Sequence, residues 1–172
     1  VHMYSSHNMW EEGLRVAKAN GSKNEINELA KKWVANLSKD QAIKMLLSMN
    51  LGEAAIDILC DSKDFEAAFK LAEQYERYKI PDVHLKYAME LEDEKDFLRA
   101  EEHYIKSNQV QEVIQMYEHI NDYQSALRIA RQHDPASVTS IYMNQGKYFL
   151  DRKEYSKAEI CFVSAKQPEY MV

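Results

Sequence analysis

The sequence predicts an all-α protein, an α-solenoid in which about eleven helices stack as antiparallel pairs. The chain has 172 residues, of which 45% are hydrophobic, so it can bury a core. It holds only four glycines and three prolines, which leaves few tight turns for a β-sandwich or barrel. The helix formers Ala, Leu, Glu, Lys, Met and Gln are abundant, and one short motif recurs along the chain.

The recurring motif is an acidic residue, an aromatic residue, two variable residues and Ala. Its copies begin at Asp64, Asp96, Asp122 and Glu154. The aromatic positions are 32, 26 and 32 residues apart (97 − 65, 123 − 97, 155 − 123), and Trp10 and Gly13 open the chain with a degenerate copy. The acidic residue is expected to cap the second helix of each pair. The aromatic should fill the space between paired helices, and the Ala should let the neighbouring helix approach.

These spacings resemble the tetratricopeptide repeat, which runs at about 34 residues, with shortened members. The last copy fits that pattern best. Tyr142, Gly146 and Phe149 take the large, small and large positions of its first helix. In its second helix the small, aromatic and small positions are taken by Ala158, Phe162 and Ala165.

In chain order, the predicted helices span 9–20, 24–36, 39–49, 51–61, 64–77, 81–93, 96–107, 109–120, 122–133, 135–151 and 154–166. Pro81, Pro135 and Pro168 each stand where a helix is expected to begin, with Asp134 as an N-cap. The segment Gly21-Ser22-Lys23-Asn24 is expected to be an exposed loop. We expect residues 1–8 to be a tag scar or disordered start, and residues 9–172 to form a single helical solenoid, a fragment of a longer chain.

No motif in the sequence indicates catalysis, a cofactor or a metal. The histidines form no metal-ligand pattern with each other or with cysteines, and should lie partly buried or exposed on helices: His2, His7, His84, His103, His119 and His133. Adjacent carboxylates such as Glu101-Glu102 are expected to be solvated charges on a helix. Cys60 and Cys161 should be buried free thiols. We therefore predict that the chain is not an enzyme and has no catalytic, cofactor or metal residue.

Charge and hydropathy restrict the partners. The formal charge of −6, from 28 acidic and 22 basic residues, disfavours nucleic acid as a ligand. No apolar run approaches the roughly 20 residues that a membrane span requires. Protein partners remain. The acidic run from Glu90 to Glu94 is either a docking patch or a solvated helix end.

Several side chains are candidates for contact with a partner. The aromatic ones should mostly pack between helices with their hydroxyls at the rim, while a few anchor a partner: Tyr75, Tyr78, Tyr87, Tyr104, Tyr117 and Tyr148. Asn144 stands where some tetratricopeptide proteins bind a terminal carboxylate. Ser140 replaces the companion Lys, so that ligand is not expected.

Longer segments are more specific than the repeat. They are Pro81–Glu94, Met116–His119, Asp122–Ala130 and Asp134–Val138. These segments resemble the C-terminal tetratricopeptide-like solenoid of the largest subunit of the intraflagellar transport B complex, and the resemblance runs from about Trp10 to the end. Tyr123 stands where Trp is usual in that family, a conservative departure.

The resemblance implies a protein-interaction scaffold segment of a transport train, needed for assembly of the cilium. In that family, WD40 propellers precede a long helical tail that contacts other train subunits. It implies other intraflagellar transport subunits as partners and a location in the cilium or flagellum and at the ciliary base, on the cytoplasmic side. Vesicle-coat and tethering subunits have a similar fold and are the alternative. Self-association could arise because a cut solenoid exposes apolar ends.

Overall fold

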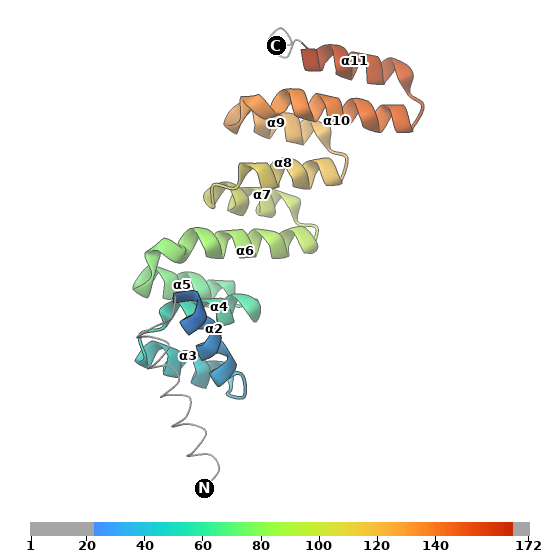
Figure 1. The fold of residues 1–172 in the computed structure, drawn as a ribbon. Helices are drawn as coiled ribbons and strands as arrows, with labels where there is room; N and C mark the ends of the chain where they lie inside the picture. Colours follow the sequence, from blue (N-terminus) through green and yellow to red (C-terminus); the bar gives the residue numbers. More distant parts are fainter. Residues whose placement is uncertain (1–22, 167–172) are drawn as a thin grey trace. The chain divides into compact units, whose positions relative to one another are not determined.

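The structure is a computed structural model that describes residues 23–166, and this part of the chain is entirely helical (Figure 1). Its α-helices are α2 (Lys23–Val34), α3 (Lys39–Ser48), α4 (Gly52–Asp61), α5 (Phe65–Tyr75), α6 (Ile80–Asp93), α7 (Phe97–Lys106), α8 (Val110–His119), α9 (Tyr123–His133), α10 (Val138–Asp151) and α11 (Tyr155–Lys166). Short 3₁₀ turns, η1 (Arg77–Lys79) and η2 (Pro135–Ser137), precede α6 and α10. The predicted all-α solenoid is confirmed.

The predicted helices agree with the observed ones to within three residues at each end. The helix predicted at 9–20 and the N-terminal position of Pro168 lie outside the described residues. The loop predicted at 21–24 is wrong in its second half, because Lys23 and Asn24 already belong to α2. Polar residues are well tolerated in a first helical turn, whose amides have no partner within the helix.

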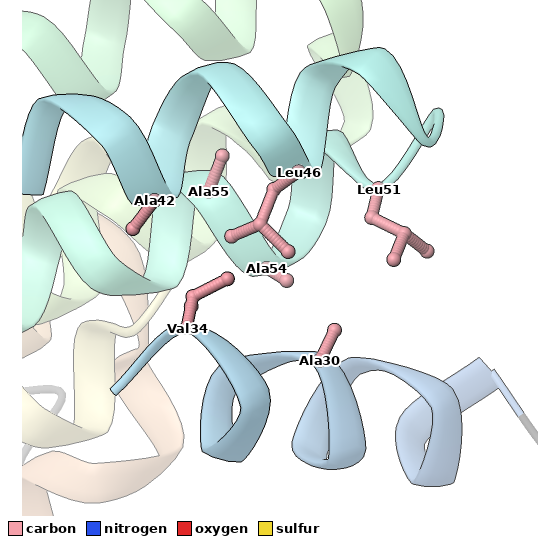
Figure 2. Close-up of a cluster of buried hydrophobic side chains, with 7 residues drawn as sticks. All are labelled: Ala30, Val34, Ala42, Leu46, Leu51, Ala54 and Ala55. Atoms are coloured by element: carbon pink, nitrogen blue, oxygen red, sulfur yellow. The ribbon is translucent and has the colours of Figure 1, made fainter. Parts of the chain in front are cut away.

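Contacts divide the chain into two compact units, Val1–Tyr87 and Ala88–Val172, with the division inside α6. The single solenoid over residues 9–172 stays a prediction. In the first unit, small side chains let α2, α3 and α4 approach closely around Leu46 (Figure 2). This cluster of buried residues consists of Ala30, Val34, Ala42, Leu46, Leu51, Ala54 and Ala55. A neighbouring cluster joins α4, α5 and α6, where the ring of Tyr87 stacks on Phe65 at 4.7 Å.

In the second unit, the buried side chains come from every helix between α7 and α11, including Tyr104, Met116 and Ile129. Gly146 marks the tightest part of the α10–α11 pair. A Cβ atom placed there would lie 2.6 Å from the ring of Phe162. The small position predicted for Gly146 in the last repeat is therefore confirmed.

The capping role of the acidic residue is confirmed at three copies of the motif, and the burial of its Ala at all four. The motif alanines Ala68, Ala100, Ala126 and Ala158 are at most 1% exposed. The carboxylate of Asp122 accepts from the amide of Ser125 at 3.2 Å, and Asp64 and Asp96 cap their helices in the same way at 3.4 Å. At the fourth copy the Glu154 carboxylate pairs with the Lys157 ammonium at 2.7 Å.

The aromatic position of the motif fills the helix pair at two copies only. Phe65 and Tyr123 are buried and Phe97 is half-buried, but Tyr155 is 65% exposed. The packing role predicted for Tyr155 is thus wrong. The side of α11 that carries Tyr155 is not covered by any helix in the described part of the chain.

Six of the helix connections share one turn geometry. In each, a residue with φ near 60° precedes the first residues of the next helix: Asn50, Lys63, Lys95, Asn108, Asn121 and Lys153. The amide of the following residue then donates to the carbonyl five residues earlier, as from Asp96 to Leu91 at 2.8 Å. This is the Schellman arrangement. At the three Asp copies of the motif, the Asp amide therefore donates to the last turn of one helix, and the Asp carboxylate caps the first turn of the next.

Two further connections are the 3₁₀ turns, and they recur 58 residues apart (134 − 76) at Glu76 and Asp134. The same period relates Asp64 to Asp122 and Ala88 to Gly146. Spacings of 32 and 26 residues thus alternate within one four-helix period. Asp134 takes the N-cap position of η2, and α10 begins only after this turn. The Asp134 carboxylate makes no capping bond to an amide but accepts from the Ser137 hydroxyl at 2.5 Å.

Candidate interaction surface

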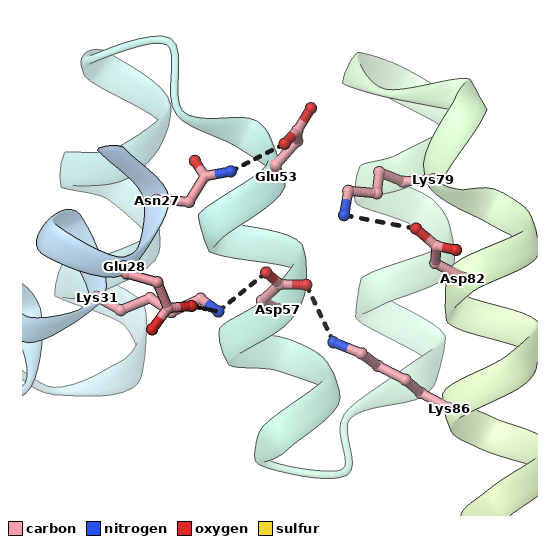
Figure 3. A network of polar contacts seen from close by, with 8 residues as sticks. All are labelled: Asn27, Glu28, Lys31, Glu53, Asp57, Lys79, Asp82 and Lys86. Atoms are coloured by element: carbon pink, nitrogen blue, oxygen red, sulfur yellow. Dashed lines mark hydrogen bonds and ion pairs between the residues drawn. The ribbon is translucent and has the colours of Figure 1, made fainter. Parts of the chain in front are cut away.

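A polar seam joins α2, α4 and α6 in the first unit (Figure 3). The Asp57 carboxylate lies 3.0 Å from the ammonium groups of both Lys31 and Lys86. Burial acts to raise the pKa of Asp57, but the two lysines outweigh it and hold the pKa below its usual value. Beside this pair, the amide of Asn27 donates to the buried Glu53 carboxylate at 2.9 Å. These carboxylates are engaged in helix packing rather than presented to a ligand.

A second seam joins α7, α8 and α9 through Glu101. Both oxygens of this carboxylate accept from the Arg128 guanidinium, at 3.1 and 2.8 Å, and the Tyr117 hydroxyl donates to it as well. Burial acts to raise the pKa of Glu101, but these hydrogen bonds hold it below its usual value. The prediction that Glu101 is a solvated charge is wrong, since its side chain is only 15% exposed. Glu102 is exposed, as predicted, and its carboxylate pairs with the Lys106 ammonium at 2.9 Å.

The acidic run from Glu90 to Glu94 is partly used inside the fold. The Glu92 carboxylate accepts from the hydroxyl of buried Tyr104 at 2.6 Å. Asp93 and Glu94 are exposed at the end of α6. The choice between a docking patch and a solvated helix end stays open.

The tyrosines fall into two groups, as predicted. Tyr104 and Tyr117 are 2% exposed and direct their hydroxyls to carboxylates at the rim, while Tyr87 and Tyr148 are half-buried. Tyr75 and Tyr78, by contrast, are 54% and 56% exposed. A partner can reach only members of this second group without repacking the helices.

The histidines and cysteines lie in ordinary helical surroundings. His84 packs its ring 4.6 Å from that of Phe69, His103 is half-buried, and His119 and His133 are exposed. His2 and His7 lie outside the described residues. Both cysteines are buried and free, and burial raises the pKa of Cys60 to about 11.

Residues 23–166 contain no group of three or more His, Cys, Asp or Glu side chains that could hold a metal ion. None of the helices described is both long and apolar enough to cross a bilayer.

Asn144, the candidate for a terminal carboxylate, is bonded within the fold. Its amide donates to the Glu118 carboxylate of α8 at 3.0 Å, and Ser140 is exposed one turn earlier on α10. A peptide carboxylate at this point would face Glu118. That this ligand is not bound stays a prediction.

One groove in the second unit combines an apolar floor with a polar rim, and we call it the α9–α11 groove. Its volume is about 280 Å³. Its residues are Gln124, Leu127, Tyr142, Gln145, Phe149, Lys157, Ile160, Cys161 and Ser164. Leu127 and Tyr142 are buried, whereas Ile160 is 62% exposed. Sequence reasoning missed Ile160, because an isolated apolar residue on a helix gives no sign of whether a neighbour covers it.

The geometry of the α9–α11 groove suits a protein segment better than a small substrate. An exposed apolar side chain beside amides and a lysine offers contacts to a helix or an extended peptide. The polar groups held in the two seams are already paired within the fold.

The whole chain is similar to known proteins of one kind. It is 41% identical over 172 residues to the intraflagellar transport protein 172 homolog of Danio rerio, covering 100% of this chain. It is 39% identical over 169 residues to intraflagellar transport protein 172 of Chlamydomonas reinhardtii and 38% over 168 residues to the homolog of Homo sapiens, covering 98% of this chain in both cases. The chain spans 10% of the length of each of these relatives. No family model matches the chain.

Proposed function

The chain is homologous along its whole length to intraflagellar transport protein 172, and we propose that it is a protein-binding scaffold segment of such a subunit. In this role it performs no catalysis. It holds other subunits of a transport complex through its helical surface. The single observation that carries the proposal is the homology, which extends from one end of the chain to the other.

The organisation of polar groups supports a binding role. Asp57 and Glu101, the two partly buried carboxylates whose pKa values are lowered, each face cations from neighbouring helices at 3.1 Å or less. Such pairs fix helices against each other. A catalytic carboxylate would instead need an open side toward a substrate.

The distribution of apolar groups points the same way. Leu98, Ile160 and Met89 are 77%, 62% and 54% exposed. Of these, Ile160 lies in a concave groove with buried neighbours, where a partner side chain can be surrounded. We propose the α9–α11 groove as one contact site for another subunit.

The proposal extends to organisation and place. Residues 9–172 form one continuous segment of a longer helical tail, and the protein acts in the cilium or flagellum and at its base, on the cytoplasmic side. Because the chain spans only a tenth of its relatives, these statements concern one segment of a larger subunit.

Ciliated cells that lack the endogenous protein provide the test. The tagged full-length protein carrying this segment should restore cilia, localise to them and co-purify with other intraflagellar transport subunits. Localisation to the Golgi or endosomes together with coat subunits would instead support the vesicle-coat alternative and contradict the proposal.

A pair of variants tests the groove. Ile160→Glu places a charge among the residues that line the groove and should reduce recovery of at least one co-purifying subunit by about tenfold, the effect of roughly 1.4 kcal/mol. Leu98→Glu makes the same change at a more exposed leucine outside the groove and should leave recovery unchanged. If Leu98→Glu reduced recovery of a subunit and Ile160→Glu did not, the groove would not be the contact site.

A further inference from the structure

One side of α11 is largely apolar and partly exposed, and we call it the α11 face. It consists of the exposed Tyr155, Glu159 and Val163, the half-buried Phe162 and the buried Ala158. Tyr155 and Val163 are 65% and 56% exposed. With Leu150 and Lys166 these residues line a hollow of about 350 Å³. Glu159 forms no ion pair with any residue between 23 and 166 that the structure describes.

The 58-residue period identifies an equivalent face on α7. Going back 58 residues from the α11 face leads to Phe97, Ala100, Glu101, Tyr104 and Ile105. There Tyr104 is 2% exposed, and Phe97 and Ile105 are half-buried. The chemistry matches position by position: an aromatic, Ala, Glu, a second aromatic and a β-branched residue.

On the α7 face, the following helix pair contacts Glu101. Helix α8 packs against α7. The Tyr117 hydroxyl of α8 donates a hydrogen bond to the Glu101 carboxylate, and the Arg128 guanidinium of α9 donates to the same carboxylate at 2.8 Å. The α11 face has the same residue types at the equivalent positions, and no helix pair follows α11 within residues 23–166.

We propose that a further helix pair of the α8–α9 kind covers the α11 face, and that it comes from the part of the longer protein that follows Lys166. Two observations favour this occupant over a separate protein. The relatives are about ten times as long as this chain. In the sequence, Gln167 and Pro168 stand 58 residues after Gln109 and Val110, the N-cap and first residue of α8, and proline is favoured at a first helical position.

The equivalence also predicts the chemistry of the cover. Its first helix presents an apolar stripe to Tyr155, Phe162 and Val163. A hydroxyl or guanidinium group of the pair binds Glu159, as Tyr117 and Arg128 bind Glu101. Leaving Glu159 unpaired under an apolar cover would be unfavourable, because a buried carboxylate requires a partner.

Cysteine labelling tests the cover directly. Val163→Cys is placed in the purified full-length protein and in the 172-residue chain, and modification of that peptide by a small maleimide is followed by mass spectrometry. Labelling should be at least about tenfold slower in the full-length protein, since a covered site reacts only after local opening. Leu98→Cys, at a leucine 77% exposed, should react at the same rate in both.

Equal labelling of Val163→Cys in the two proteins would overturn the proposal. So would protection that appears in the 172-residue chain as its concentration rises, because the cover would then be a second copy. In the full-length protein, Glu159→Ala should restore a large part of the lost labelling rate, and no effect would remove the predicted role of Glu159.

Discussion

Gly146 shows how one residue sets the distance between two helices. A Cβ atom at this position would lie 2.6 Å from the ring of Phe162 on α11, closer than packing allows. The tetratricopeptide pattern predicts this small residue from sequence alone. The pattern works here because both members of the contact, Gly146 and Phe162, belong to the same helix pair.

Gly146→Ala should destabilise the protein by about 1 kcal/mol, measured by urea unfolding. Overpacking costs about 1–3 kcal/mol, and the better helix propensity of Ala returns up to about 1 kcal/mol. Adding Phe162→Leu, which removes part of the ring, should recover most of the loss. A single variant more stable than the original protein would contradict the close contact.

Glu101 shows where prediction from sequence ends. It and Glu102 are adjacent and chemically alike, yet only Glu101 is held, by Arg128 from α9 and Tyr117 from α8. Arg128 lies 27 residues further along the chain. Local patterns identify neighbours on one helix, whereas this contact depends on how three helices pack.

Removing Arg128 should make the free energy of unfolding less dependent on pH in the acid range. The folded-state pKa of Glu101 is lowered, so its ion pair stabilises the protein above the unfolded pKa of about 4.3 and is lost as the pH falls through the folded value. Arg128→Met should therefore cost about 1 kcal/mol at pH 7, a value kept low because Arg128 is 46% exposed. The cost should shrink below pH 4.

Urea unfolding of the two proteins between pH 3 and 7 measures this difference. Arg128→Lys keeps the charge but not the bidentate contact. At pH 7 its stability should lie between those of the original protein and Arg128→Met. A cost that does not change with pH would show that the pair does not contribute through the charge of Glu101.

At the scale of elements, the turns were less predictable than the helices. The acidic and aromatic motif locates the start of each second helix. The residue before it, which ends the previous helix with positive φ, is Lys or Asn at all four copies: Lys63, Lys95, Asn121 and Lys153. Asn is a known signal for this conformation, but Lys is not. The exposed Tyr155 was mispredicted because its motif resembles the others and only its surroundings differ.

Lys95→Gly should stabilise the protein by about 0.5–1 kcal/mol, because glycine adopts positive φ without the steric cost that Lys95 carries at φ 65°. The midpoint of thermal unfolding measures the change. Lys147→Gly makes the same substitution at an exposed position inside α10 and should cost about 1 kcal/mol. Equal decreases in the midpoint of thermal unfolding for the two variants would show that the turn does not favour glycine.

At the scale of the molecule, the motif spacings of 32 and 26 residues look irregular in the sequence. The structure gives them a common period, because η1 and η2 enter alternate helix pairs 58 residues apart. Equivalent helices bury equivalent residues: Ile56 and Ile114 are at most 3% exposed, as are Ala68 and Ala126. This period could not be derived from propensity, which does not distinguish a 3₁₀ entry from a Schellman turn.

If the period is structural, one whole period can be removed. Deleting Lys63 to Ile120, 58 residues (120 − 63 + 1), joins Ser62 to Asn121, which has nearly the φ of Lys63. Helix α4 then precedes α9 through the turn that now joins α4 to α5, and Ala126 replaces Ala68 against it. The shortened chain should keep its helix content per residue by circular dichroism and unfold cooperatively in urea.

A control variant lacks three residues more, through Tyr123, and so also loses the positive-φ residue, the cap and the aromatic. That variant should lose cooperative unfolding, and equal behaviour of the two deletions would show that the 58-residue period does not determine how the helices stack.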